Sequence, residues 1–427
     1  MAIAAGSACR SRQPPPNYPP DLPFMRDLFQ RRTAECLALS NYTKPGSYKI
    51  EALMLHMWVE LFRTPDTQAG LIFILATTIK LAFRMGYQRD PKFFPEISAM
   101  EGEMRRRIWA HLYQMDTILS FQAGSPRSIQ DWQYDTELPR NLSDENFDEN
   151  TERLPPSLPD SQPTTVSYLR AKMRLVEAFG PISDTAFSRK ETVSYGKIIG
   201  LDKSLEEAHE LIPTFLKVRP LELSIGDPIT TIVKRFTLET CYQKSRCVLH
   251  RRYVGGMHPS QQYLYSRLTC IGAAMEILRQ HAVVYNEVQP GGRLYGDISL
   301  THSLHNGDFL LAAMIICLSL ASSREEGNSP QKNGILVEDR TAFLLTLEKT
   351  HEIFKDLGRQ SADAQKACDA LGLMLRKVNG EQHVPQVSSK VYSNGADTVS
   401  PSTISVINGM TARFFAPCTL LHLQVRH

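Results

Sequence analysis

The stretch of sequence that decides the fold covers residues 101–120 and reads Glu101-Gly-Glu-Met-Arg-Arg-Arg-Ile-Trp-Ala-His-Leu-Tyr-Gln-Met-Asp-Thr-Ile-Leu-Ser120. Four of its apolar residues recur at the spacing of one helical face: Ile108, Leu112, Met115 and Leu119. We therefore predict a helix that packs this side against a hydrophobic core.

Charged residues fill the first turns of the same helix. Glu101 and Glu103 each stand four residues before an arginine, Arg105 and Arg107, and each pair is worth ~0.2–0.5 kcal/mol on an exposed face. The three consecutive arginines, with Arg106 between them, fan out by about 200° and cannot all meet one surface. Salt-bridged arginines with buried stems are the favoured interpretation. A phosphate-binding patch is the alternative.

Trp109, Tyr113 and Asp116 lie on one side of this helix, and the apolar stripe flanks Asp116. A buried carboxylate needs a partner, and we expect an arginine or backbone N–H donors. If Asp116 is buried and paired, Asp116→Ala leaves a cation uncompensated and costs ~3–5 kcal/mol.

Other helices follow on both sides of this one. Thr64, Pro65 and Asp66 suit the start of an apolar helix that Gly86 can end, and the absence of a polar face predicts burial on all sides. Further helical segments are predicted at residues 24–40, 51–62, 201–215, 227–253, 264–278, 307–322, 336–354 and 362–378. No sustained strand pattern occurs, so the predicted fold class is all-α, a multi-helix domain with buried central helices and long surface loops.

The composition along the chain predicts a division into three regions. Residues 1–23 are rich in proline and predicted to be disordered, residues 24–380 form the helical domain, and residues 381–427 are a polar linker and tail. Within the domain, residues 139–164 are rich in Pro, Asp, Glu, Asn and Ser, which is typical of a surface loop.

Composition excludes several classes of protein. The 427 residues carry 48 Lys and Arg against 45 Asp and Glu, a net charge of +3, and 42% are hydrophobic, as in a soluble globular protein. The longest apolar runs are too short to cross a membrane. The near-neutral charge gives no overall attraction to nucleic acid, and the eight scattered cysteines indicate a reducing compartment.

Searches for catalytic chemistry find no phosphate-binding loop, no nucleophile turn and no Cys-x-x-Cys zinc spacing. One acidic cluster could hold Mg²⁺ as in an all-α enzyme, but a loop supplies fixed ligands poorly, so a solvated loop is favoured. The cluster consists of Asp144, Glu145, Asp148 and Glu149. Cys241 and Cys247 do not share a helical face, and burial is the favoured interpretation of both. We expect no catalytic residue, no cofactor and no metal site.

Several segments together resemble the middle homology region of fungal-specific transcription factors over about residues 24–380. Leu81-Ala-Phe-Arg-Met-Gly86-Tyr-Gln-Arg-Asp-Pro91 and Glu103-Met-Arg-Arg-Arg-Ile-Trp109 resemble two of its motifs. Leu249-His250-Arg251-Arg-Tyr-Val and Cys270-Ile-Gly-Ala-Ala resemble two more. Between them, residues follow in the family's order: Asp116, Ser120, Gly124, Pro126, Asp135, Leu138, Pro139, Asn141 and Asp144.

The chain also departs from the family's pattern. Ala110 replaces a second tryptophan, Ser125 replaces an arginine, and Arg252 replaces a proline. The larger departure is the zinc cluster of six cysteines, because only Cys9 and Cys36 occur in the first 240 residues. Zinc is therefore expected only if an N-terminal cysteine cluster is missing from this sequence.

The resemblance implies a regulatory domain of a nuclear transcription regulator, without catalysis, that controls a metabolic or secondary-metabolite gene cluster. Three accounts of the missing cluster stay open: a truncated factor, a natural cluster-less regulator, or a retained sensing module. DNA contact is then indirect or made by a missing N-terminal domain, and the partners are the transcription machinery or another regulator, with a small-molecule effector possible. The alternatives are an interaction or ligand-sensing module that acts through a DNA-binding partner, and an all-α enzyme of unrecognised type.

Overall fold

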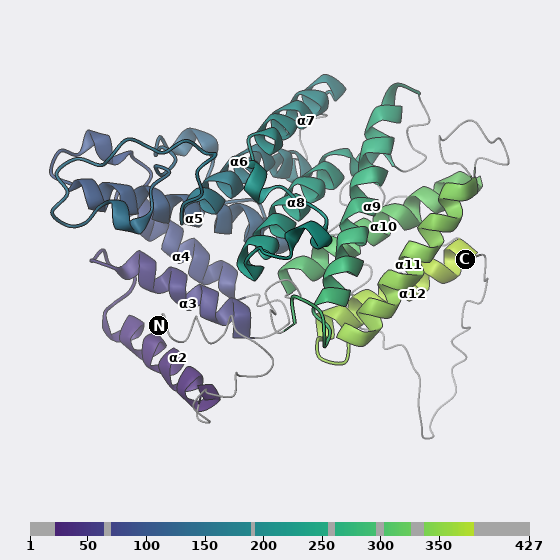
Figure 1. Ribbon diagram of the computed structural model, residues 1–427, viewed down its shortest axis with the longest axis horizontal. Coiled ribbons are helices and arrows are strands. Elements are labelled where there is room, and N and C mark those ends of the chain that lie inside the picture. Colours follow the sequence, from purple (N-terminus) through teal and green to yellow (C-terminus); the bar gives the residue numbers. More distant parts are fainter. Residues whose placement is uncertain are drawn as a thin grey trace. The chain divides into compact units, whose positions relative to one another are not determined.

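Helices supply all the regular secondary structure in the part of the chain that the computed structural model describes, residues 22–63, 70–188, 193–254, 261–295, 303–325 and 337–379 (Figure 1). No strand occurs in these ranges, and the predicted all-α class is confirmed. The chain divides into two compact units, Met1–Leu249 with Val283–His305, and His250–Ala282 with Asn306–His427.

The first unit contains a series of helices in which chain neighbours pack together, α2 on α3, α3 on α4, and so on to α7. The helices are α2 (Leu22–Leu39), α3 (Lys49–Arg63), α4 (Leu71–Arg84), α5 (Ala99–Gln122), α6 (Ser167–Phe187), α7 (Tyr195–Glu210) and α8 (Ile229–His250). Short 3₁₀ turns connect them: η1 (Pro91–Phe93), η2 (Asp131–Gln133), η3 (Asp144–Asn146), η4 (Thr214–Leu216) and η5 (Leu221–Ser224). Helix α2 begins at Leu22, two residues before the predicted start of this helix at residue 24 and within the predicted Pro-rich segment. Residues 1–21 of that segment lie outside the described residues, as does the whole predicted tail, residues 381–427.

Helix α5 is the buried central helix of this unit. Ser98 caps it by accepting a hydrogen bond from the Glu101 N–H at 3.2 Å. Three residues of the predicted apolar stripe are buried and the fourth, Leu119, is half-buried. Trp109 is 1% exposed and packs against the rings of Phe83 and Tyr134. Burial of this helix fixes the position of the polar side chains on its covered sides.

The structure corrects the prediction for the burial of helix α4. It was predicted to be buried on all sides, but Phe73 is 74% exposed and continues as an exposed stripe with Ala76, Lys80 and Arg84. The apolar pattern is real, yet neighbouring helices cover only the opposite face, with Leu75 and Ile79 fully buried. The proposed starting residues of this helix lie outside the described residues.

The second unit contains α9 (Leu264–Glu287) up to residue 282, α10 (Ser303–Glu325), α11 (Val337–Leu357) and α12 (Ala362–Asn379), together with η6 (Arg251–Tyr253) and η7 (Gln261–Tyr263). Helix α11 packs on α12. On α10 every residue from 308 to 317 is buried. None of the described helices combines the length and the apolar character that crossing a membrane requires.

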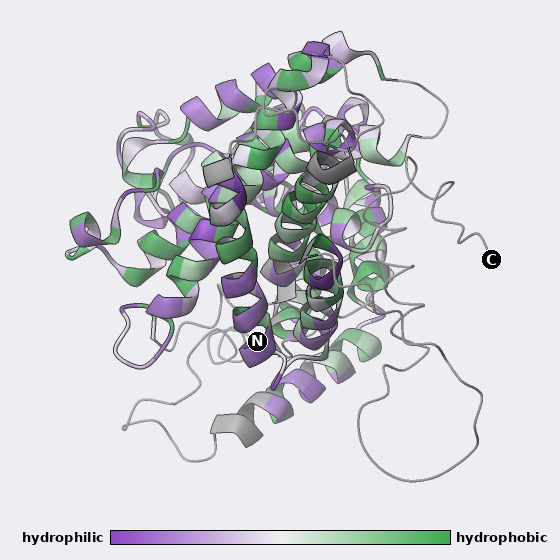
Figure 2. Ribbon diagram, turned by 90° about the vertical axis from the view of Figure 1, so that its right-hand side faces the viewer, coloured by the Kyte–Doolittle hydropathy of each residue, from purple (hydrophilic) through white to green (hydrophobic). Residues whose placement is uncertain are grey.

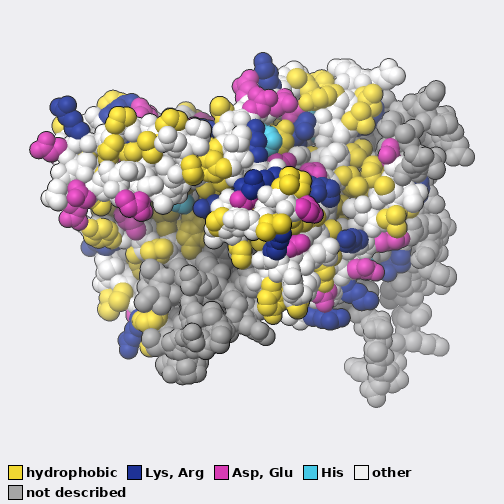
Figure 3. Space-filling model, in the orientation of Figure 1, with side chains coloured by type: hydrophobic (Ala, Val, Ile, Leu, Met, Phe, Trp, Pro, Cys, Tyr) yellow, Lys and Arg dark blue, Asp and Glu magenta, His cyan; other side chains and the backbone are white. Residues whose placement is uncertain are grey.

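The helices of both units carry hydrophobic and hydrophilic residues along their length (Figure 2). On the face drawn in Figure 3, lysine and arginine side chains lie among aspartate and glutamate side chains. This mixture agrees with the small net charge of the chain.

Candidate functional site: a loop fastened to helix α5

Residues 123–166, between α5 and α6, form an irregular segment that contains only the short turns η2 and η3. We call it the fastened loop, because buried polar side chains of α5 and α6 hold it at several points. The predicted surface loop, residues 139–164, is its second half. Most residues of the family resemblance lie in this loop or on helix α5.

The first fastening is a buried ion pair between Arg106 on α5 and Asp90, just before η1. The guanidinium donates to both carboxylate oxygens at 2.8 and 2.7 Å, and Asp90 is fully buried. Asp90 also accepts from the backbone N–H of Glu137 in the loop at 3.0 Å. Burial alone would raise the pKa of Asp90, but these hydrogen bonds, with one from the Lys92 N–H, lower it to about 2.

The second fastening joins Glu103 and Arg107 to the loop. Arg107 donates to Glu103 at 3.1 Å and to the Leu142 carbonyl at 2.9 Å, and it also pairs with Asp144. Glu103 accepts from the Arg140 N–H at 3.2 Å. Glu103 is fully buried rather than on an exposed face, and burial raises the pKa of its carboxyl although these hydrogen bonds oppose the rise.

Each of the three consecutive arginines therefore has its own carboxylate. Arg105 pairs with Glu101 at 3.0 Å, and its guanidinium lies 5.0 Å from the ring centroid of Tyr87. Arg106 and Arg107 are about nine-tenths buried. The geometry agrees with the salt-bridge interpretation and not with a phosphate-binding patch.

The third fastening is Asp116, which is 1% exposed. It accepts hydrogen bonds from the backbone N–H groups of Ser128 and Ile129 at 2.8 and 2.7 Å, and from the Ser120 hydroxyl at 3.2 Å. Backbone donors are thus its partners, and the prediction that its removal strands a cation is wrong. Burial raises the pKa of Asp116, and the hydrogen bonds reduce this effect.

A fourth fastening, which the sequence reasoning missed, centres on Arg127. Its guanidinium is almost fully buried and contacts Asp131 at 2.7 Å, Asp184 of α6 at 2.7 Å and the Tyr113 hydroxyl at 2.8 Å. Burial alone would lower the pKa of Arg127, but the two carboxylates raise it. No sequence signal links these residues, because Asp184 lies on the next helix.

Gly180 on α6 leaves room for this network. A methyl group added at Gly180 would stand 2.6 Å from Nη1 of Arg127 and 2.9 Å from the Tyr113 hydroxyl. Only glycine lets helix α6 approach the buried guanidinium this closely.

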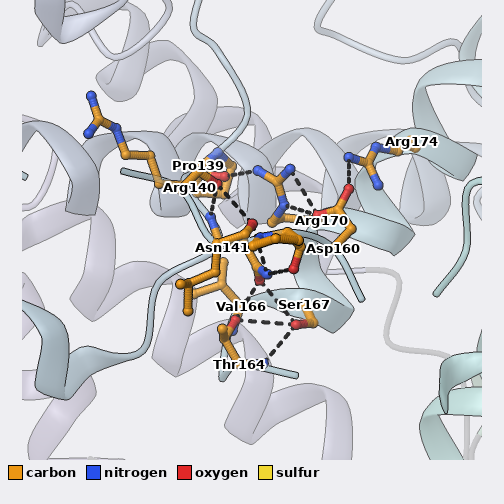
Figure 4. Close-up of polar contacts among 12 residues, drawn as sticks. Pro139, Arg140, Asn141, Asp160, Thr164, Val166, Ser167, Arg170 and Arg174 are labelled. Atoms are coloured by element: carbon orange, nitrogen blue, oxygen red, sulfur yellow. Dashed lines mark hydrogen bonds and ion pairs between the residues drawn. The ribbon is translucent and has the colours of Figure 1, made fainter. Parts of the chain in front are cut away.

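Asn141 holds the second half of the loop in a closed shape (Figure 4). Its side-chain N–H₂ donates to the carbonyls of Pro159 and Gln162 at 2.9 and 3.1 Å, and its Oδ1 accepts from the hydroxyls of Thr164 and Ser167 at 2.7 and 3.1 Å. Asn141 is fully buried, so one amide satisfies several loop groups away from water.

Helix α6 adds a basic contact beside this amide. Arg170 donates to the Pro139 carbonyl and to Asp160 at 3.2 Å, and Arg174 donates to the same carboxylate at 2.6 Å (Figure 4). The carbonyl of Pro139, one of the residues of the family resemblance, is therefore held by a side chain of the next helix.

The remaining residues of the resemblance shape the turns. Gly86 and Gly124 have φ of 78° and 69°, a left-handed conformation that follows the ends of α4 and α5. Pro126 lies in the turn before Ser128. Asp135 accepts from the Asp90 N–H at 2.8 Å and pairs with Arg89 at 3.1 Å.

His250 and Arg251 belong to the second unit. The buried His250 ring lies with Nδ1 2.9 Å from the Ser266 hydroxyl and meets Tyr265 edge-on. Arg251 begins the turn η6. These two residues are part of the packing within their own unit.

The contacts of the candidate acidic and cysteine side chains fit a structural role better than a catalytic one. Asp144 pairs with Arg107, and Asp148 accepts from the Asn150 N–H and the Thr151 hydroxyl, so two of the four loop acids already have partners. In the second unit, Cys368 lies 3.4 Å from Nε2 of His351, but burial raises the pKa of the thiol and keeps it protonated. No group of three or more His, Cys, Asp or Glu residues in the described ranges could hold a metal ion.

These observations define an all-helical scaffold whose buried charges hold a loop in one shape. Residues 22–211 match the family described as "Fungal specific transcription factor domain". The chain belongs to this family of fungal transcription factors, and its relatives are transcription factors and not enzymes.

Several fungal transcription factors are similar in sequence to most of the chain. The Zn(2)-C6 fungal-type transcription factor mpsB of Macrophomina phaseolina is 34% identical over 97% of this chain and 57% of its own length. The Equisetin cluster transcription factor eqxF of Fusarium heterosporum is 34% identical over 90% of this chain and 54% of its own length. The Pyrrolocin cluster transcription factor fsdR of a fungal species is 35% identical over 86% of this chain and 48% of its own length. The chain spans about half the length of these relatives, and no solved structure is significantly similar to it.

Proposed function

We propose that this chain is the regulatory part of a nuclear transcription factor that controls a secondary-metabolite gene cluster. The observation that carries the proposal is the extent of the similarity. Factors named for metabolite clusters resemble 86–90% of the chain, which includes α8 to α11 beyond the matched family domain. The fastened loop supports it, because buried ion pairs give a scaffold a defined shape for a partner to recognise.

Direct binding of DNA by these 427 residues is not part of the proposal. Affinity for a duplex comes mainly from phosphate contacts by lysine and arginine, and the three consecutive arginines are already paired with carboxylates. We infer that DNA is reached through a partner or through a segment outside this sequence, and that any zinc cluster belongs to that segment.

A reporter assay tests the regulatory role. The full chain is fused to a heterologous DNA-binding module and expressed beside a reporter gene that carries the module's site. We expect the fusion to change transcription relative to the module alone. Transcription identical to that of the module alone would overturn the proposed role.

A gel-shift series tests the DNA inference separately. The purified chain is mixed with random-sequence duplex at increasing salt. We expect no complex even at low salt. A complex whose affinity falls steeply with salt would show that the chain itself contacts phosphates and would contradict indirect binding.

A further inference from the structure

Lysine side chains from helices α6 and α8 of the first unit gather around one aromatic ring. The ammonium nitrogens of Lys172 on α6 and Lys234 on α8 lie 5.8 and 5.7 Å from the ring centroid of Tyr168. His111 of α5 lies close enough to Lys172 to feel its charge. We call these four residues the lysine–tyrosine cluster.

Neither lysine has a carboxylate within ion-pair distance among the described residues, whereas the neighbouring arginines do. Arg170 and Arg174, on either side of Lys172 in the sequence, share Asp160. Arg235, directly after Lys234, pairs with Asp227. The positions three and four residues from each lysine on its own helix hold Tyr, Leu, Val or Thr. The two lysines therefore stand out as unpaired cations in a region where other cations are paired.

The two ammonium groups lie near the same ring. Both lysines are half-buried, and because each ammonium lies within 6 Å of the same ring centroid, the two charges are at most about 12 Å apart. The ring face attracts each cation, but it does not cancel the repulsion between them. An anion that contacts both ammonium groups would be attracted by both charges.

His111 adds a neutral polar group to the cluster. Desolvation by the surrounding protein lowers the pKa of His111, and the charge of Lys172 acts in the same direction. At neutral pH the imidazole is uncharged, so it can accept or donate a hydrogen bond beside Lys172.

We propose that Lys172 and Lys234, with Tyr168 and His111, bind the carboxylate or phosphate group of a small anionic molecule. The half-burial of both lysines favours a small molecule over a DNA backbone, which is gripped by side chains that extend from the surface. A role for this ligand as an effector of transcription rests on the proposed function, whereas its binding does not.

Isothermal titration calorimetry of the full chain tests the site with two probes, citrate and pyrophosphate, at matched ionic strength. We expect saturable binding of at least one. Citrate alone identifies a carboxylate site, pyrophosphate alone a phosphate site, and both a general anion site. Lys172→Ala and Lys234→Ala should each weaken binding about tenfold or more.

Lys80→Ala is the matched control, because Lys80 also lies over one ring, that of Phe83, but without a second cation on it. This variant should bind the probes like the unchanged chain. Absence of binding by both probes, or equal weakening in the control, would overturn the proposal. Neither result bears on the reporter assay, so the two proposals fail independently.

Lys172→Glu guards against a variant that loses binding because it unfolds. It places a carboxylate near Lys234, so we expect a higher melting temperature together with loss of probe binding. A lower melting temperature with binding retained would refute the cluster as the site. Displacement of a bound probe by duplex DNA would refute the small-molecule assignment.

Discussion

At the scale of single residues, the buried carboxylates of the first unit differ in what faces them. Asp90 meets a guanidinium and two backbone N–H groups, which lower its pKa to about 2. Asp116 meets backbone N–H groups and a hydroxyl, and its pKa is raised by burial. A carboxylate without a cation still serves as a fastening point, because it accepts hydrogen bonds from three donors, two of them in buried contacts.

Asp116→Ala should destabilise the protein by about 1–3 kcal/mol, because the buried N–H group of Ile129 and the part-buried N–H group of Ser128 lose their acceptor. Urea unfolding measures this free energy. Ser120→Ala, which removes only one hydrogen bond to the same carboxylate, is the control and should cost less. Equal stability of Asp116→Ala and the unchanged chain would mean that the loop does not depend on this contact.

At the scale of elements, an ion pair joins helix α6 to the fastened loop, and a glycine on α6 leaves room for that ion pair. Arg127 of the loop pairs with Asp184 of α6, and this is possible because Gly180, one turn earlier, presents no Cβ to the guanidinium. The close approach of α6 to α5 therefore depends on one glycine and one arginine together.

Gly180→Ala should destabilise the protein by about 1–3 kcal/mol, since the new methyl group stands 2.6 Å from Arg127 and forces the network apart. Gly200→Ala on α7 is the matched control. Nothing lies within 4 Å of its added Cβ, so it should stabilise the helix by about 0.4–1 kcal/mol. Thermal unfolding of both variants measures the difference, and a shift in the same direction for both would contradict the steric argument.

At the scale of the whole molecule, the chain forms two compact units. The first unit contains the fastened loop and the lysine–tyrosine cluster, and the second contains the buried helix α10. Cooperative opening generally follows such units, so damage to one need not spread to the other.

Hydrogen exchange of the Gly180→Ala variant should reveal this division. We expect faster exchange in α5 and α6, where the network is disturbed, and unchanged exchange in α11 and α12 of the second unit. Mass spectrometry of peptides from these helices measures both in one experiment. An equal increase in all four helices would show that the two units open as one.

The sequence by itself determined what depends on neighbours along the chain. Helical spacing predicted α5 and its burial, Gly86 predicted the end of α4, and the four-residue spacing predicted the pairs Glu101–Arg105 and Glu103–Arg107. A helix places residues three and four apart on one face whatever surrounds it, so these features need no knowledge of the fold.

Only the tertiary structure decided what depends on residues brought together from distant segments. Asp90 as the partner of Arg106, backbone groups as the partners of Asp116, and the exposed stripe of α4 follow from how helices and loop meet. The meeting of Lys172 and Lys234 over Tyr168 has the same origin. The helical period fixes which way a side chain points, whereas the group that it meets there is set by the packing of the whole unit.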